Sequence, residues 1–265
     1  MFVGIKVVIM TISVFLFGSA RNSAAAQSSP QQVMAGIYQK YDSINFLSFD
    51  VSYIYTTDTA YGDFSHEKLD GSYTMAGKRA KYNIGDIEFM QNDSFFIAVY
   101  TQQKMIVVAD PHSDNSGNEL PMRKMIDSII NFSGQHYTIS NYSDTSTGIL
   151  RFDRTDSLAD FDLLKVAYDT TSNLLKSIKY VYTEMQVLNP EDTTGAPPKI
   201  IPRHKSLEIE FSNYRVDNLP DELYNENSYV WFENGECKPV QKYADYKVYY
   251  AKTALAPGSP EQGDR

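Results

Sequence analysis

Residues 69–110 read LDGSYTMAGKRAKYNIGDIEFMQNDSFFIAVYTQQKMIVVAD, and this stretch decides the fold. Four runs rich in Tyr, Phe and β-branched residues alternate with three short turn signals, Ala76-Gly77-Lys78, Gln91-Asn92-Asp93 and Thr101-Gln102-Gln103. Strands joined by two to five turn residues are antiparallel neighbours. The stretch therefore predicts an antiparallel meander.

Two of these runs are apolar at consecutive positions, 95–100 (FFIAVY) and 106–109 (IVVA). Successive side chains of a strand point to opposite faces, so these strands are apolar on both faces and need a cover on each. The hydrophobic core supplies one cover. A helix, a partner or a ligand must supply the other.

A helix and a strand precede the meander. Residues 30–43 predict a helix with Pro at its first position and one apolar stripe, formed by Val33, Ile37, Tyr38 and Tyr41. Residues 46–56 (FLSFDVSYIYT) alternate and predict a strand whose one face carries Phe49, Val51, Tyr53 and Tyr55. Residues 57–67 are polar and predict a connection.

The second half predicts one more helix and a series of strands. Residues 120–132 place Met122, Met125, Ile126, Ile129 and Ile130 at helical spacing, and Gly134 follows as a stop signal. Residues 185–203 contain Asn189-Pro190 and Pro197-Pro198 and predict an irregular excursion, and 219–227 predict a loop or a short turn of helix. Strands are expected over 135–141, 148–153, 161–168, 174–183, 205–214, 229–232, 236–240 and 243–251.

The N-terminus has the pattern of an export signal. Lys6 precedes the apolar run 7–17, which is too short to span a bilayer, and Ala24-Ala25-Ala26 supplies a cleavage site. An uncleaved membrane anchor is the alternative interpretation. We expect residues 1–26 to be a cleaved signal peptide, residues 27–251 to form a single β domain, and residues 252–265 to be a disordered tail. This pattern predicts a periplasmic or otherwise exported protein.

Charge and cysteine content exclude several classes of partner. Loss of Lys6 and Arg21 with the signal takes the formal net charge from −9 to −11, which disfavours nucleic acid and anionic lipid surfaces. The single cysteine, Cys237, has no partner within the chain, so no internal disulfide is possible and a buried thiol is expected. The hydrophobic core must hold the fold, and we expect a monomer.

Catalytic and metal-binding motifs are absent from the sequence. No two of the four histidines, His66, His112, His136 and His204, lie at helical metal-ligand spacing. The acidic loop 111–119 does not have the ligand spacing of a calcium loop. No nucleophile elbow, zinc-protease motif or phosphate loop is present. The sequence therefore predicts no enzyme, no metal and no cofactor.

The order of elements resembles that of the LolA-like family of periplasmic lipoprotein carriers. The segments that carry the resemblance are YQKYDSINFLSFDVSYIY (38–55), LDGSYTMAGKRAKYNI (69–84), IEFMQNDSFFIAVYTQQKMIVVADP (87–111) and LKVAYDTTSNLLKSIKYVY (164–182). The resemblance implies a mainly β (α+β) fold, a curved antiparallel sheet forming an incomplete β-barrel. Short amphipathic helices would cover its concave side.

The resemblance also implies a function, a carrier that holds acyl chains of outer-membrane lipoproteins or other lipids between sheet and helices. Its partners would be an inner-membrane donor and an outer-membrane acceptor. A binding or sensor module on the same fold, recognising a lipidated or protein partner, is the alternative. In either case Lys78, Arg79 and Lys81 are candidates for docking an acidic partner.

The acyl-chain site itself is predicted from the strand alternation. We expect one face of the sheet to carry its apolar lining, with two residues of helix 120–132 opposite. The candidates are Phe49, Val51, Tyr53, Tyr55, Tyr73, Met75, Tyr82, Ile84, Phe89, Ile97 and Val99 on the sheet, with Met125 and Ile129 on the helix. The alternative is that the same residues are ordinary core.

Overall fold

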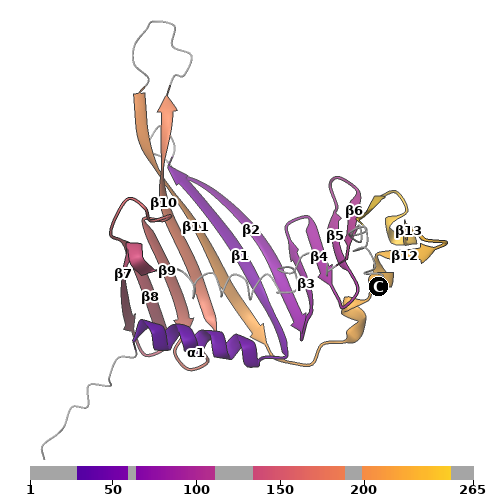
Figure 1. The fold of residues 1–265 in the computed structure, drawn as a ribbon, viewed down its shortest axis with the longest axis horizontal. Coiled ribbons are helices and arrows are strands. Elements are labelled where there is room, and N and C mark those ends of the chain that lie inside the picture. The colour runs from indigo at the N-terminus through magenta and orange to yellow at the C-terminus, as the bar shows by residue number, and fades with distance from the viewer. Residues whose placement is uncertain (1–28, 59–63, 111–133, 189–198, 252–265) are drawn as a thin grey trace, which may run out of the picture.

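The computed structural model describes residues 29–58, 64–110, 134–188 and 199–251. One α-helix, α1 (Pro30–Ser43), is followed by the strands of a large sheet (Figure 1). The strands are β1 (Phe46–Asp58), β2 (Phe64–Ala76), β3 (Arg79–Ile84), β4 (Ile87–Gln91), β5 (Phe96–Tyr100), β6 (Met105–Ala109), β7 (Tyr137–Ser143), β8 (Thr147–Arg154), β9 (Leu163–Asp169), β10 (Leu175–Leu188), β11 (Lys199–Arg215), β12 (Val230–Glu233), β13 (Glu236–Pro239) and β14 (Lys247–Ala251). Short 3-10 turns are η1 (Gly134–His136), η2 (Asp221–Tyr224), η3 (Glu226–Ser228) and η4 (Gln241–Tyr243).

Twelve strands form one sheet in the order β14-β6-β5-β4-β3-β2-β1-β11-β10-β9-β8-β7, and β12–β13 form a separate hairpin. Every neighbouring pair is antiparallel except β14 and β6, which are parallel. The sheet curves but its two edges, β14 and β7, are not joined (Figure 1). The expected open, curved, mainly antiparallel sheet is therefore confirmed.

Helix α1 begins and ends where the sequence predicts. Ser29 caps it: the Ser29 hydroxyl accepts from the Gln32 amide at 3.2 Å, and the Gln32 side chain accepts from the Ser29 amide at 2.9 Å. Val33, Ile37 and Tyr41 of the predicted stripe are buried and face the sheet, but Tyr38 is exposed, so its assignment to the stripe is wrong. The helix lies across the ends of the strands β8 to β11 (Figure 1).

The predicted strand boundaries need four main corrections. The strand expected over 243–251 begins only at Lys247, because Gln241–Tyr243 form the 3-10 turn η4. The run 79–91 is two strands, because Gly85 adopts a φ of +57° and turns the chain between β3 and β4. The polar connection expected over 57–67 is shorter, since β2 already begins at Phe64. The excursion expected over 185–203 is also shorter, because β10 and β11 continue as a hairpin that pairs Leu188 with Lys199. The helix expected over 120–132, the loop 111–119, the signal peptide and the tail lie outside the described residues.

The register assigns each side chain to one of two faces, which we call the α1 face and the far face. Phe49, Tyr73, Tyr82 and Phe89 are successive register partners, and Phe49 and Tyr73 pack in one cluster with the buried residues of α1. Their neighbours along the strands point to the far face. There, Met90, Ile97, Val99, Ile106 and Val108 form a second buried cluster with Tyr229, Val230 and Tyr243.

The C-terminal segment, residues 219–251, thus covers the far face of β4 to β6. Polar contacts fasten it there: Arg79 pairs with Asp221 at 2.8 Å, and Asn92 donates to the Tyr224 carbonyl at 3.0 Å. Within the described ranges, no helix has the length and hydropathy that crossing a membrane requires.

Candidate functional site on the α1 face

An aromatic row crosses six strands on the α1 face. It runs from Tyr214 on β11 through Phe49, Tyr73, Tyr82 and Phe89 to Phe96 on β5. The ring centroids of successive residues lie 5.2, 5.1, 5.7, 4.5 and 6.0 Å apart. Aromatic pairs at such distances stabilise a sheet and present a continuous apolar surface.

Among the residues that the structure describes, α1 covers only one end of this row. Phe49 and Tyr73, beside α1, are 4% and 6% exposed, whereas Tyr82, Phe89 and Phe96 are only half-buried. The face is therefore divided into a closed part under α1 and an open part over β1 to β6 and the adjoining residues of β11. The open part is apolar and half-buried, and its further members are Tyr53, Tyr55, Ile84, Ile87, Tyr100, Met105, Val107 and Leu207, with Leu69 more exposed.

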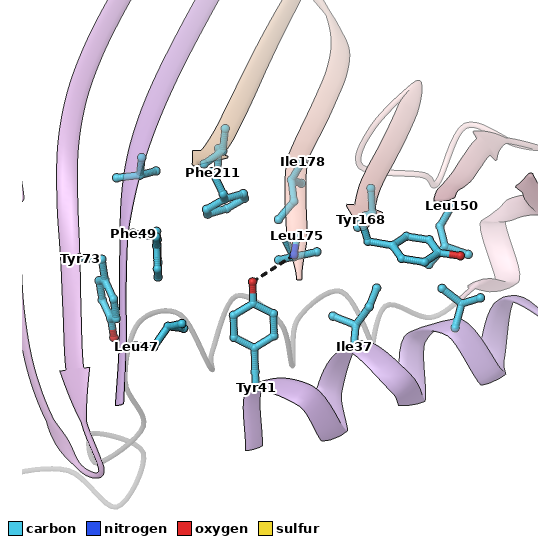
Figure 2. Packing of buried hydrophobic residues seen from close by; sticks show 14 of the residues in the cluster. Ile37, Tyr41, Leu47, Phe49, Tyr73, Leu150, Tyr168, Leu175, Ile178 and Phe211 are labelled. Carbon is cyan, nitrogen blue, oxygen red and sulfur yellow. Dashed lines mark hydrogen bonds between the residues drawn. The ribbon is translucent and has the colours of Figure 1, made fainter. Parts of the chain in front are cut away.

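Hydrogen bonds fix the boundary between the two parts. The Tyr41 hydroxyl of α1 accepts from the Leu175 amide at 3.1 Å (Figure 2). It also contacts the Tyr214 hydroxyl at 2.8 Å, and Tyr214 donates to the Leu175 carbonyl at 2.9 Å. Burial raises the pKa of Tyr41 to about 12, and burial also raises that of Tyr214. These uncharged hydroxyls satisfy the backbone of Leu175, where the β9–β10 register shifts.

Apart from the end remote from α1, where Glu67 and Lys205 lie, the open part carries uncharged side chains. Burial, and then the neighbouring Tyr53 and Tyr100, raise the pKa of Tyr82 to about 12, and burial raises the pKa of Tyr53 and of Tyr180. At neutral pH these tyrosines are therefore protonated. Such a surface accepts an apolar molecule without burying an unpaired charge.

A polar group lies at the end of the open part that is remote from α1. The Tyr182 hydroxyl donates to the Tyr55 hydroxyl at 3.5 Å, and Lys205, the register partner of Tyr182, contacts Tyr55 and forms an ion pair with Glu184. Hydrogen bonds from Thr57, Tyr182 and Lys205 lower the pKa of Tyr55, although burial opposes them. We call Tyr55, Tyr182 and Lys205 the tyrosine–lysine group.

The register separates the predicted lining residues into two sets. Nine lie on the α1 face, namely Phe49, Val51, Tyr53, Tyr55, Tyr73, Met75, Tyr82, Ile84 and Phe89. Ile97 and Val99 do not: they pair with Met90 and Glu88 and lie in the far-face cluster, so the expectation of a shared face is wrong for both. The strand 96–100 is apolar on both faces, so its composition gave no sign of the correct face. Met125 and Ile129 lie outside the described residues.

The predicted docking residues are mostly engaged within the chain. Arg79 pairs with Asp221 and lies over the Tyr224 ring, with its guanidinium carbon 5.1 Å from the ring centroid. Lys81 pairs with Glu88 at 2.9 Å. Lys81 also lies over the Tyr229 ring, so both residues contact the C-terminal segment, and of the three only Lys78 is exposed. Docking of an acidic partner by these residues stays a prediction.

Sequence reasoning missed Leu207, Tyr180 and Lys205 as neighbours of the predicted site. They come from β10 and β11, which pair with β1 across a long separation in the chain. In residues 205–214, Leu207, Ile209 and Phe211 alternate with Glu208 and Glu210, which indicates that Leu207 faces inward, but only the register places it beside Tyr55. Among the described residues, no group of three or more His, Cys, Asp or Glu side chains is arranged to hold a metal ion.

The chain was compared with known proteins. Neither the protein-family models nor the curated proteins gave a match. Solved structures with similarity include a candidate outer membrane lipoprotein-sorting protein domain of Vibrio parahaemolyticus, with 12% identity, a TM-score of 0.31, and coverage of 74% of this chain and 96% of that one. A LolA superfamily protein of Nitrosomonas europaea has 14% identity, a TM-score of 0.21, and coverage of 73% and 98%.

A third similar structure is the MucA/MucB complex of Pseudomonas aeruginosa, with 12% identity and a TM-score of 0.38. The match covers 79% of this chain but only 62% of that one. The architecture described above has the elements that the sequence resemblance implies, an open curved antiparallel sheet with a helix packed across one face. The fold of this chain is therefore a large curved sheet that is not closed into a barrel.

Proposed function

We propose that this protein binds acyl chains on the open part of the α1 face, and that it is a periplasmic carrier for outer-membrane lipoproteins or other lipids. The observation that supports this most directly is the row of half-buried aromatic side chains, Tyr82, Phe89 and Phe96, which continues the closed core without a charged residue. An acyl chain is the ligand that such a long, uncharged surface fits.

The energetics agree with reversible binding. A buried methylene contributes about 0.8 kcal/mol, so a long acyl chain gains on the order of 10 kcal/mol before ordering costs. After those costs, an affinity in the micromolar range or better is expected. Reversible binding is what a carrier requires, because it must release its ligand.

Two adjacent residues of β1 provide a matched test. Tyr53 lies on the α1 face and Ile54 on the far face, and both are half-buried. In a delipidated protein, we expect Tyr53→Asp to weaken binding of a fluorescent fatty acid at least tenfold, because it places a charge in the site. Ile54→Asp, beside Lys68, should leave binding unchanged. Equal binding by both variants and the wild type would rule out this face.

Native mass spectrometry of gently purified protein tests the natural ligand. We expect a co-purifying mass of a lipid or lipidated chain, lost in the Tyr53→Asp variant. The same measurement tests export, since a mature chain should begin near Gln27, and a periplasmic species that retains Met1 would contradict a cleaved signal.

A binding or sensor module on the same fold is the second candidate. It is favoured by the β10–β11 hairpin, which projects beyond the sheet and carries Met185 and Ile200 at 66% and 56% exposure (Figure 1). Exposed apolar residues on a projecting element suit contact with a partner. A transfer assay separates the two: a carrier delivers bound lipid to acceptor membranes or proteins, whereas a sensor retains it.

A further inference from the structure

The open part of the α1 face is not uniform along its strands. On the strands β1 and β11, this face begins beside α1 with the ring contact between Phe49 and Tyr214. It continues through the register pair Tyr53 and Ile209 to the pair Tyr55 and Leu207. The next pair of positions holds Thr57 and Lys205. The surface therefore changes from apolar to hydrogen-bonding at one defined end.

That end is rich in donors. Tyr55, Tyr182 and Lys205 come from three neighbouring strands, β1, β10 and β11, and their polar atoms converge. The Lys205 side chain is only 22% exposed, so its methylenes pack on the sheet while its ammonium group reaches the polar end. Tyrosine hydroxyls can donate, and an ammonium group can only donate, so the natural complement is an acceptor oxygen.

Glu184, the acidic residue beside the tyrosine–lysine group, does not prevent this group from binding a ligand. Glu184 pairs with Lys205, but the Glu184 side chain is 57% exposed and so can turn into water. An ion pair at the surface is weak and is readily exchanged for another. Glu67, the register partner of Tyr55, is exposed as well.

We propose that the tyrosine–lysine group receives the oxygen-bearing end of the bound alkyl chain, a carboxylate or an ester carbonyl, and so fixes the direction in which the chain lies. This assignment rests on the proposed function. The chain would extend from Lys205 over Tyr55 and Leu207 toward the aromatic row. The ligand is accordingly an amphiphile with an acceptor head, not a hydrocarbon or a cationic lipid.

The sheet offers a matched control for Lys205. Lys179 forms an equivalent ion pair with Glu208, also between β10 and β11 but on the far face, at 2.9 Å. Lys205→Met removes the charge of the tyrosine–lysine group and keeps the stem. Lys179→Met makes the same change on the opposite side of the same strands.

The test uses the full mature chain and three probes with the same alkyl length: dodecanoate, methyl dodecanoate and dodecyltrimethylammonium. We expect Lys205→Met to weaken dodecanoate binding about tenfold, to weaken the ester less, and to leave the cationic probe unchanged. Tyr55→Phe should weaken both acceptor heads about threefold. Lys179→Met should bind all three probes as the wild type does. Whichever of dodecanoate and methyl dodecanoate binds more tightly to the wild type identifies the head group of the ligand. Tighter dodecanoate indicates a free fatty acid, and tighter ester indicates an esterified lipid.

Two results would overturn the assignment while the proposed function stands. One is wild-type dodecanoate affinity in both Lys205→Met and Tyr55→Phe. The other is an equal loss for all three probes in folded variants, which would mean that the residues act on the chain site alone. If the wild type binds none of the three probes, the proposed function fails and the assignment fails with it. Circular dichroism spectra identify any variant that is unfolded. If Lys205→Met is unfolded, the affinities of Tyr55→Phe, which removes only one oxygen, decide whether the assignment holds.

Discussion

The two faces of the sheet over β4 to β6 are both apolar but differ in what covers them. On the far face, Ile97, Ile106 and Val108 are fully buried by the C-terminal segment of the same chain. On the α1 face of the same strands, Phe89 and Val107 are only half-buried. A surface closed by its own chain contributes to stability, whereas a surface left partly open is the one available to a ligand.

The largest effect should come from placing the same charge on each face. Ile97→Asp buries an unpaired carboxylate in the far-face cluster and should cost several kcal/mol, on the order of 4, or prevent folding. Ile84→Asp, on the half-buried α1 face, should cost about 1 kcal/mol and instead weaken acyl-chain binding. Urea unfolding followed by fluorescence measures both. Equal destabilisation would show that the two faces are equally closed.

The boundary between closed and open parts should depend on one hydroxyl. Tyr41→Phe leaves the Leu175 amide without its acceptor and Tyr214 without its neighbour, at a cost of about 1–3 kcal/mol. Tyr38→Phe, on the exposed side of the same helix, is the control and should be neutral. Denaturant midpoints compare the two variants. A neutral Tyr41→Phe would mean that packing alone holds α1 on the sheet.

The fastening of the C-terminal segment should weaken in acid. Burial favours a raised pKa for Glu88, but hydrogen bonds from Tyr229 and Lys81 outweigh it and lower the pKa below the ordinary value of 4.5. A carboxylate with a lowered folded pKa stabilises the fold above its ordinary pKa, and this stabilisation is lost as the pH falls through the folded pKa. We expect Glu88→Gln to lower the free energy of unfolding by about 1 kcal/mol at pH 7. The difference in this free energy between the variant and the wild type should shrink below about pH 4. A constant difference from pH 7 to pH 3 would contradict this role, and Glu210→Gln on the exposed far face is the control.

The smallest effect concerns Cys237, which is half-buried among the residues that pack against the far-face cluster. Because the chain holds no second cysteine, reducing agent should leave the melting temperature unchanged. A fall of several degrees on reduction would instead indicate a disulfide between two copies of the chain.

Local pattern predicted much of this fold. Helix 30–43 begins where predicted because Ser29, Pro30 and Gln32 form a complete start signal, and strand 46–56 is predicted by its alternation. Alternation and turn lengths also predict that one face carries Phe49, Tyr73, Tyr82 and Phe89. All these features depend on residues that are close together in the sequence, so the sequence of one chain is enough to predict them.

The failures have one physical origin, which is pairing between distant segments. Whether Ile97 or Ala98 faces α1 could not be read from FFIAVY, since both alternatives are apolar. That Arg79 and Lys81 serve the C-terminal segment depends on Asp221 and Tyr229, far along the chain. The tyrosine–lysine group depends likewise on the pairing of β1 with β11, and no local signal specifies that register.

The pairing of β1 with β11 has a consequence for the order of folding. Asp50 and Asn213, which bond across this seam, are 163 residues apart in sequence, and Lys104 and Asp245, at the β6–β14 edge, are 141 apart. Loops this long close slowly, so the sheet should be a slow folder. Neither the central seam nor the β6 edge can form until the C-terminal part of the chain has been synthesised. Until then β4 to β6 expose an apolar face that is prone to aggregation, and the nascent chain should depend on a holding chaperone.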